Sequence, residues 1–157
     1  MRTLQTGGLQ WIEVREKRQE AFLIRVQRLE ELRVVLVDDH KEVRSALSGY
    51  LSDLGAIVRE CANAEDARET ILGLHPDLVL SDIAMPGKDG FELLREIRSL
   101  DPSDGSEVPV IAITGLNRPL DQMRAPAAGF DAVLLKPFTP DVLLQVISEV
   151  IHRRSRL

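Results

Sequence analysis

From residue 33 onward, the chain alternates short aliphatic runs with stretches of helical periodicity. The runs have strand length and are apolar enough to be buried on both faces of a sheet. They are Val34–Val37, Ala56–Arg59, Leu78–Leu80, Val110–Ile113 and Ala132–Leu135. Between them, apolar residues recur every three or four positions, which is typical of helices with one buried face. The pattern therefore predicts five strands alternating with helices.

Helix-start signals support this alternation. Asn63 precedes Asp66 at capping-box spacing, and Thr139 followed by Pro140 is typical of an N-cap with proline at the first helical position. Parallel neighbouring strands require right-handed crossovers, which the helices supply. We therefore predict an α/β fold, a doubly wound five-stranded parallel sheet with helices on both faces.

The fourth helical segment, Asn117–Ala128, contains two prolines. Pro119 fits the start of a helix, whereas Pro126 lacks the amide hydrogen that a helix interior uses. We therefore expect Pro126 to interrupt this helix and the helix to be short.

The first 32 residues differ from the rest. Trp11–Leu32 has no Gly or Pro and is rich in Glu, Arg and Gln, which predicts one long helix. Its apolar positions fit a heptad poorly, because a frame through Trp11 and Leu32 also places Arg15 at a core position. The predicted organisation is an N-terminal helical extension (1–32), a domain (33–153) and a C-terminal tail (154–157).

Charge and composition argue against several classes of partner. The chain carries 20 Lys and Arg against 25 Asp and Glu, a net charge of −5, so we expect no nucleic-acid partner. Residues 1–32 hold +1, which leaves −6 in residues 33–157, so the acidity belongs to the domain. The single cysteine, Cys61, cannot form an internal disulfide, and no apolar run approaches the roughly 18 residues of a membrane span. We expect a cytoplasmic protein with no membrane partner.

Polar side chains follow the predicted strands at the points where the strands end. Asp38 and Asp39 follow the first run, Asp82 the third, Thr114 the fourth and Lys136 the fifth. Ligands of open parallel sheets bind outside these carboxyl ends. We therefore expect three carboxylates, a hydroxyl and an ammonium group to lie close together.

This set of groups indicates phosphoryl chemistry. Three neighbouring carboxylates repel one another unless a cation joins them, and an oxygen-rich, histidine-poor site suits Mg²⁺. Lys136 indicates an anionic ligand. A metal, an ammonium group and a free carboxylate are typical of phosphoryl transfer, with Asp82 as the natural nucleophile.

Four motifs carry a resemblance to a known family. They are VLVDDH (35–40), LVLSDIAMPGKDGFELL (78–94), VIAITGL (110–116) and LLKPF (134–138). With these motifs, residues 33–153 resemble the response regulator receiver domains of two-component phosphorelays. The resemblance implies a flavodoxin-like sheet with strand order 2-1-3-4-5.

The resemblance also implies roles for individual residues. Asp82 would be the phosphoacceptor, and Mg²⁺ would bind Asp39, Asp82 and the backbone carbonyl of Ala84 directly. Asp38 would act on the metal through a bound water. The phosphoryl donor would be a histidine kinase or a histidine phosphotransfer protein.

Further implied roles concern the phosphoryl group and the response to it. Lys136 would pair with phosphoryl oxygens, Pro137 would follow it in a cis peptide bond, and Thr114 would be the switch hydroxyl. Where the family usually has a switch aromatic, this chain has Val133, so we expect a different readout. Ala84 offers no polar group to orient an attacking water, so we also expect slow dephosphorylation.

Several interpretations remain open. The chain is predicted to be a switch and not an enzyme, acting alone or as the receiver module of a hybrid sensor kinase. It could instead be a binding scaffold, or form a homodimer through the N-terminal helix. A metal-dependent phosphatase with an aspartyl nucleophile would commonly place a second acid at position 84, where this chain has Ala84. We expect His40 to be a surface residue that opens the first helix of the domain.

Overall fold

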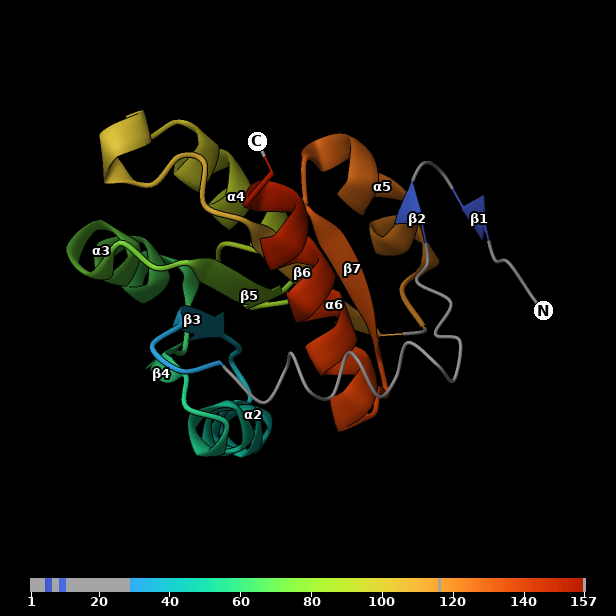
Figure 1. The fold of residues 1–157 in the computed structure, drawn as a ribbon. Helices are drawn as coiled ribbons and strands as arrows, with labels where there is room; N and C mark the ends of the chain where they lie inside the picture. Colours follow the sequence, from blue (N-terminus) through green and yellow to red (C-terminus); the bar gives the residue numbers. More distant parts are fainter. Residues whose placement is uncertain (1–4, 7–8, 11–28, 116, 157) are drawn as a thin grey trace.

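A five-stranded parallel sheet forms the centre of the part of the chain that the structure describes, residues 5–6, 9–10, 29–115 and 117–156 (Figure 1). The structure is a computed structural model. The strand order is β4-β3-β5-β6-β7. These strands are β3 (Arg33–Val37), β4 (Ile57–Cys61), β5 (Leu78–Asp82), β6 (Val110–Gly115) and β7 (Ala132–Lys136). The predicted fold class and the order 2-1-3-4-5 are therefore confirmed.

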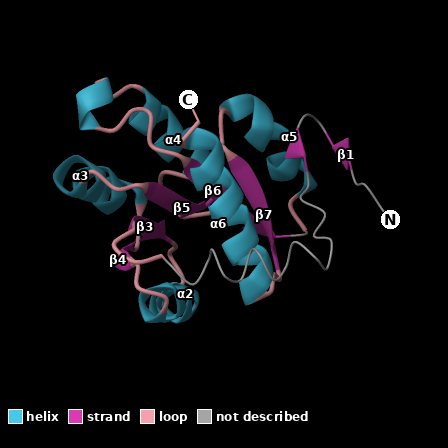
Figure 2. Cartoon of the chain, in the orientation of Figure 1, coloured by secondary structure: helices cyan, strands magenta, loops and turns pink. Residues whose placement is uncertain are grey.

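Helices cover both faces of the sheet (Figures 1 and 2). Buried side chains of α3, α4 and α5 pack on one face and those of α2 and α6 on the other. The helices are α2 (Lys41–Asp53), α3 (Ala64–Leu74), α4 (Gly90–Arg98), α5 (Pro119–Ala128) and α6 (Pro140–Arg154), with a 3-10 turn at Pro102–Asp104. No helix among the described residues is long and apolar enough to cross a membrane.

The strands are buried on both faces, which explains their continuous apolar runs. In β3, Val35 and Val37 face α3 and α4, whereas Val34 and Leu36 face α2 and α6. All four side chains are fully buried. Burial of each such side chain is worth about 1.5–3 kcal/mol, so the two aliphatic layers hold the strand ends in fixed positions.

The predicted caps are present. Asn63 accepts a hydrogen bond from the Asp66 amide (2.9 Å), and Thr139 accepts one from the Val142 amide (3.3 Å). Each bond satisfies a backbone donor that the first turn of a helix leaves free. The starts of α3 and α6 therefore follow from local sequence.

The expected interruption of α5 is wrong. The helix begins at Pro119, as predicted, but continues through Pro126 to Ala128. Pro126 costs the hydrogen bond to the residue four positions before it, but Ala125 is fully buried in the core, and this packing keeps the segment helical. The helix ends at Gly129, whose φ of 103° allows its amide to donate to the Ala125 and Pro126 carbonyls.

The predicted N-terminal helix lies mostly at residues 11–28, outside the described residues. Its last four residues, 29–32, form a turn instead, so the prediction is wrong there. Glu31 has a φ of 68° and donates its amide to the Gly55 carbonyl (3.1 Å). This contact with the loop before β4 outweighs the helix propensity of the segment. Nearer the N-terminus, β1 (Gln5–Thr6) and β2 (Leu9–Gln10) form an unpredicted antiparallel pair.

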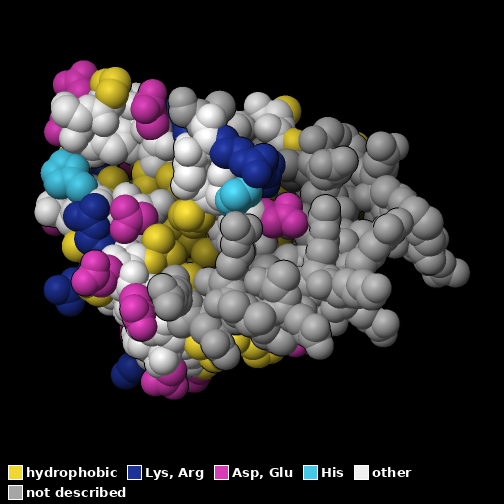
Figure 3. Space-filling model, viewed as in Figure 1, with side chains coloured by type: hydrophobic (Ala, Val, Ile, Leu, Met, Phe, Trp, Pro, Cys, Tyr) yellow, Lys and Arg dark blue, Asp and Glu magenta, His cyan; other side chains and the backbone are white. Residues whose placement is uncertain are grey.

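Asp131 joins α4, α6 and β6 at the end of the sheet where β6 and β7 begin. One carboxylate oxygen accepts from Arg98 (3.1 Å) and from the Val110 amide (2.8 Å), and the other accepts from Arg154 (2.8 Å). Lys and Arg side chains gather over the C-terminal end of α6 (Figure 3). Burial lowers the pKa of Arg98, and the charge of Asp131 opposes that shift. Asp131 therefore accepts hydrogen bonds from two arginine side chains and from the first backbone amide of β6.

We predict that Asp131→Asn lowers the free energy of unfolding by about 1–3 kcal/mol, because two charge-assisted contacts are lost. Urea unfolding followed by circular dichroism measures this. Asp101→Asn is the matched control, since Asp101 is exposed and its effect is expected within about 0.5 kcal/mol. Equal midpoints for the two variants would contradict a stabilising role of Asp131.

Candidate functional site

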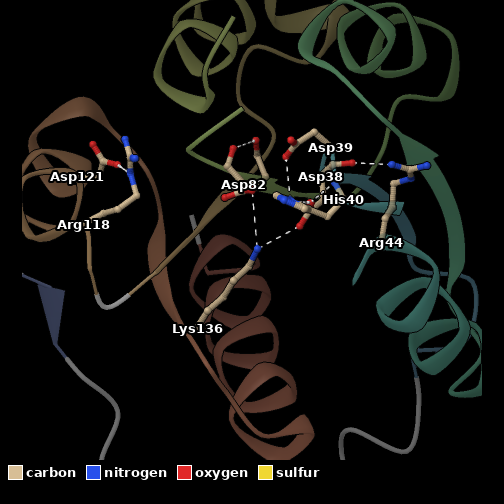
Figure 4. A network of polar contacts seen from close by, with 9 residues as sticks. Asp38, Asp39, His40, Arg44, Asp82, Arg118, Asp121 and Lys136 are labelled. Atoms are coloured by element: carbon tan, nitrogen blue, oxygen red, sulfur yellow. Dashed lines mark hydrogen bonds and ion pairs between the residues drawn. The ribbon is translucent and has the colours of Figure 1, made fainter. Parts of the chain in front are cut away.

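The structure brings four of the predicted site residues together at the carboxyl edge of the sheet: Asp38, Asp39, Asp82 and Lys136 (Figure 4). Asp38 and Asp39 directly follow β3, Asp82 ends β5 and Lys136 ends β7. The Lys136 Nζ lies 3.2 Å from Asp38 Oδ2 and 3.7 Å from Asp82 Oδ2. One ammonium group thus bridges two carboxylates that are far apart in the sequence.

Burial makes this cluster electrostatically costly. Asp38 is fully buried and Asp82 is 5% exposed. Burial raises the pKa of Asp82, Lys136 opposes that rise, and the charges of Asp38 and Asp39 add to it. The site therefore carries more negative charge than Lys136 alone neutralises.

Two buried oxygen atoms at the strand ends have no hydrogen-bond partner among the described residues. They are Asp39 Oδ1 and Thr114 Oγ1. Buried polar atoms are normally paired, so each is a candidate to meet a ligand. The His40 Nδ1 lies 3.2 Å from Asp39 Oδ1, but without the geometry of a hydrogen bond.

The donor set fits a divalent cation. Ligand atoms of Asp38, Asp39, His40 and Asp82 all lie within 4.8 Å of one another. Three of these four residues offer carboxylate oxygens, which Mg²⁺ prefers. The residues present therefore suit a magnesium ion, as the sequence predicts.

The loop after Asp82 is held by glycine and by a helix cap. A Cβ at Gly90 would lie 2.6 Å from the Asp82 carbonyl oxygen and 2.8 Å from the Ile83 Cα, so only glycine fits. Asp89 and Glu92 form a capping box at the start of α4. The Ala84 amide donates to the Asp82 carboxylate, which lowers the pKa of Asp82. These contacts fix the position of Asp82.

Arg44 supports the site and was not found from the sequence. Its Nη1 donates to the Asp38 carbonyl (2.7 Å), and its Nε donates to Glu60 (3.2 Å). The guanidinium group therefore ties the backbone of the acidic pair to β4. The spacing of positions 44 and 60 in the sequence does not predict this contact. Arg44 on α2 meets Glu60 on β4 only in the folded domain.

Lys136–Pro137 is a cis peptide bond, as the resemblance implied. Val133 is buried in the core. Phe130, the nearest preceding aromatic residue, packs edge-to-face on Phe91 with ring centroids 5.6 Å apart. Its ring is thus packed on α4.

Arg118 and Asp121 lie at the start of α5, where Arg118 is the N-cap residue and Asp121 is in the first turn (Figure 4). They form an ion pair in which Asp121 is buried. This pair and the Asp82 charge raise the pKa of Arg118. In addition, Gln122 donates to the Gly115 carbonyl (3.1 Å), which ties α5 to the residue after Thr114.

Comparisons with known proteins agree with this geometry. A family model described as response regulator receiver domain matches residues 34–148. An uncharacterised 14.6 kDa protein of Leptolyngbya boryana is 36% identical over 124 residues, covering 79% of this chain and 93% of that protein. The response regulator Rre1 of Synechocystis is 33% identical over 127 residues, covering 80% of this chain and 54% of Rre1.

A solved structure shares the fold. It is the receiver domain of the sensor histidine kinase PA1611 from Pseudomonas aeruginosa, with a magnesium ion coordinated in the active-site cleft. It is 28% identical, with a TM-score of 0.71, and covers 78% of this chain and 98% of that chain. The family match covers most of the chain and includes residues of every strand of the parallel sheet. The chain therefore belongs to the response regulator receiver domain family.

Proposed function

We propose that this chain is a phosphoacceptor switch that takes a phosphoryl group onto Asp82. The observation that carries the proposal is the position of Lys136, whose Nζ lies near both Asp38 and Asp82 in an otherwise acidic site. A cation in that place can neutralise an incoming phosphoryl group without blocking the carboxylate oxygen. Membership of the receiver family supports the same reading.

In the proposed reaction, a carboxylate oxygen of Asp82 forms a bond to phosphorus. The phosphorus–nitrogen bond of a phosphohistidine donor breaks, and the imidazole leaves with the electron pair. Lys136 then pairs with phosphoryl oxygens, because its ammonium group is already directed at Asp82. The packing of the Asp82 loop keeps the accepting oxygen in place.

Magnesium would be held by Asp39, Asp82 and the Ala84 carbonyl, with Asp38 acting through a bound water. When bound, Mg²⁺ supplies positive charge that stabilises the transferring phosphoryl group. The unpaired Asp39 Oδ1 supports this assignment, because a cation would satisfy it. Arg44 keeps the Asp38 backbone in position for the same purpose.

The readout is proposed to begin at Thr114, whose buried hydroxyl has no partner among the described residues. A phosphoryl oxygen on Asp82 would give that hydroxyl an acceptor. Movement of Thr114 would reach α5 through the Gly115 carbonyl, which Gln122 and the Arg118 amide both contact. With Val133 buried in the core, this path does not use a ring at position 133.

The proposed phosphoryl donor is a histidine kinase or a histidine phosphotransfer protein, in the cytoplasm. Output would follow by binding of a protein partner, which phosphorylation on Asp82 would strengthen or weaken. Dimerisation through the segment before residue 29 remains a separate proposal, since residues 11–28 are outside the described part of the chain.

We predict that incubation with acetyl phosphate and Mg²⁺ adds the mass of one phosphoryl group to the wild-type chain. Asp82→Asn removes the accepting oxygen and should abolish the gain. Asp53→Asn is the control, because Asp53 is exposed at the end of α2, and it should phosphorylate normally. Intact-mass spectrometry gives the result. Absence of any gain in the wild type would favour a binding scaffold instead.

We predict that Lys136→Met lowers the phosphorylation rate by about 100-fold, since the ammonium group acts on developing phosphoryl charge. Quenched time courses with phosphoramidate measure the rate. Lys41→Met, at an exposed position on α2, should leave the rate unchanged. Equal rates for the two variants would remove Lys136 from the reaction.

We predict slow dephosphorylation, with a half-life on the order of hours, because Ala84 carries no group to orient an attacking water. Ala84→Gln should shorten the half-life by supplying such a group. Phosphate release from the purified phosphoprotein measures both. A wild-type half-life below about one minute would contradict the prediction.

A further inference from the structure

His40 lies at the mouth of the acidic site. It is the N-cap residue of α2, but its side chain makes no capping hydrogen bond. The side chain is 65% exposed, yet its Nδ1 lies 3.2 Å from Asp39 Oδ1 and 3.4 Å from Asp38 Oδ1. Figure 4 shows the imidazole among the carboxylates. Its inward position is therefore explained by the acidic cluster and not by helix capping.

The spacing of the cluster places His40 within reach of an ion held by Asp39 and Asp82. The ligand atoms of Asp38, Asp39, His40 and Asp82 lie within 4.8 Å of one another. Opposite ligands of a six-coordinate ion with bonds of about 2.1 Å lie roughly 4.2 Å apart, so small side-chain rotations would suffice. Asp39 Oδ1, which lies 3.2 Å from the His40 Nδ1, is buried and has no hydrogen-bond partner among the described residues. A cation bound between the two atoms would satisfy it.

We propose that His40 is an additional ligand of this cation site. The site would then bind divalent cations that prefer imidazole, such as Ni²⁺ and Zn²⁺, through one nitrogen and the carboxylate oxygens. This inference rests on the proposed function, because it assigns a metal preference to the same site. Imidazole suits Ni²⁺ and Zn²⁺, whereas Mg²⁺ prefers carboxylate and water oxygens. Loss of His40 should therefore affect the two kinds of ion differently.

An alternative role for His40 gives the opposite result. A protonated imidazole next to Asp39 would act as a counter-ion that competes with any metal. Its removal would then raise the affinity for all divalent cations alike. A ligand role predicts weaker Ni²⁺ binding and nearly unchanged Mg²⁺ binding when His40 is replaced.

The test is calorimetric titration of the untagged full chain with Ni²⁺ and, separately, with Mg²⁺. For His40→Ala we expect Ni²⁺ affinity to fall about ten-fold or more, while Mg²⁺ affinity changes by less than about two-fold. His152→Ala is the matched control, because His152 is an exposed histidine on α6 and should change neither affinity. Folding of each variant is checked by thermal unfolding.

A specific shift of the His40 ring nitrogens on Zn²⁺ titration, observed by NMR, would support direct coordination. Equal changes in Ni²⁺ and Mg²⁺ affinity, or stronger binding of both, would overturn the inference. In those cases Mg²⁺ still binds and Asp82 still accepts a phosphoryl group, so the proposed function stands. Failure of the wild type to bind Mg²⁺ would instead reject the proposed function.

Discussion

The concentration of negative charge at one edge of the sheet is the constraint on which the site depends. Asp38 and Asp82 are buried next to each other, and Lys136 contacts both. Two unit charges 4 Å apart interact by about 4 kcal/mol at an effective dielectric constant near 20. The net stability of a whole domain is only about 5–15 kcal/mol. The repulsion between these carboxylates therefore has to be offset by nearby positive charge. Lys136 supplies part of that charge, and a divalent cation bound there, as proposed above, would supply the rest.

The aliphatic sheet makes this cost tolerable and keeps the geometry fixed. Parallel strands place all their carboxyl ends on one edge, so residues distant in sequence meet there. The strands are locked between two apolar layers, and the loop after β5 is held by the absence of a side chain at Gly90 and by the Asp89 cap. Arg44 adds a tie from α2 to the Asp38 carbonyl. The acceptor carboxylate is thus positioned before any ligand arrives.

The sequence predicts most of the sheet, because strands buried on both faces are continuous apolar runs. It also predicts the acidic site, because polar residues stand directly at the ends of these runs. Caps at Asn63 and Thr139 were also readable, since they are local. The features that the sequence does not predict depend on contacts between distant segments. They are the Arg44–Glu60 pair, the Asp131 network and the Glu31–Gly55 bond, which accompanies the turn at residues 29–32. The continuation of α5 through Pro126 is also a matter of tertiary packing, because burial of Ala125 in the core keeps the helix in place although Pro126 lacks an amide hydrogen.

Thr114 shows how the site could drive a switch without an aromatic ring. A buried hydroxyl without a partner costs about 1–3 kcal/mol, and in the proposed readout a phosphoryl oxygen that accepts its hydrogen bond would recover this amount. Two conformations whose populations differ by a factor of ten to a hundred are separated by about 1.4–2.7 kcal/mol. The two magnitudes match, so in the proposed readout satisfying one hydroxyl would be enough to shift the equilibrium. The small side chain of Val133 packs in the core and does not have to move for that shift to occur. The Gly115 carbonyl, bonded to the Gln122 side chain, then links Thr114 to α5, the helix that carries the exposed residues Leu120 and Met123.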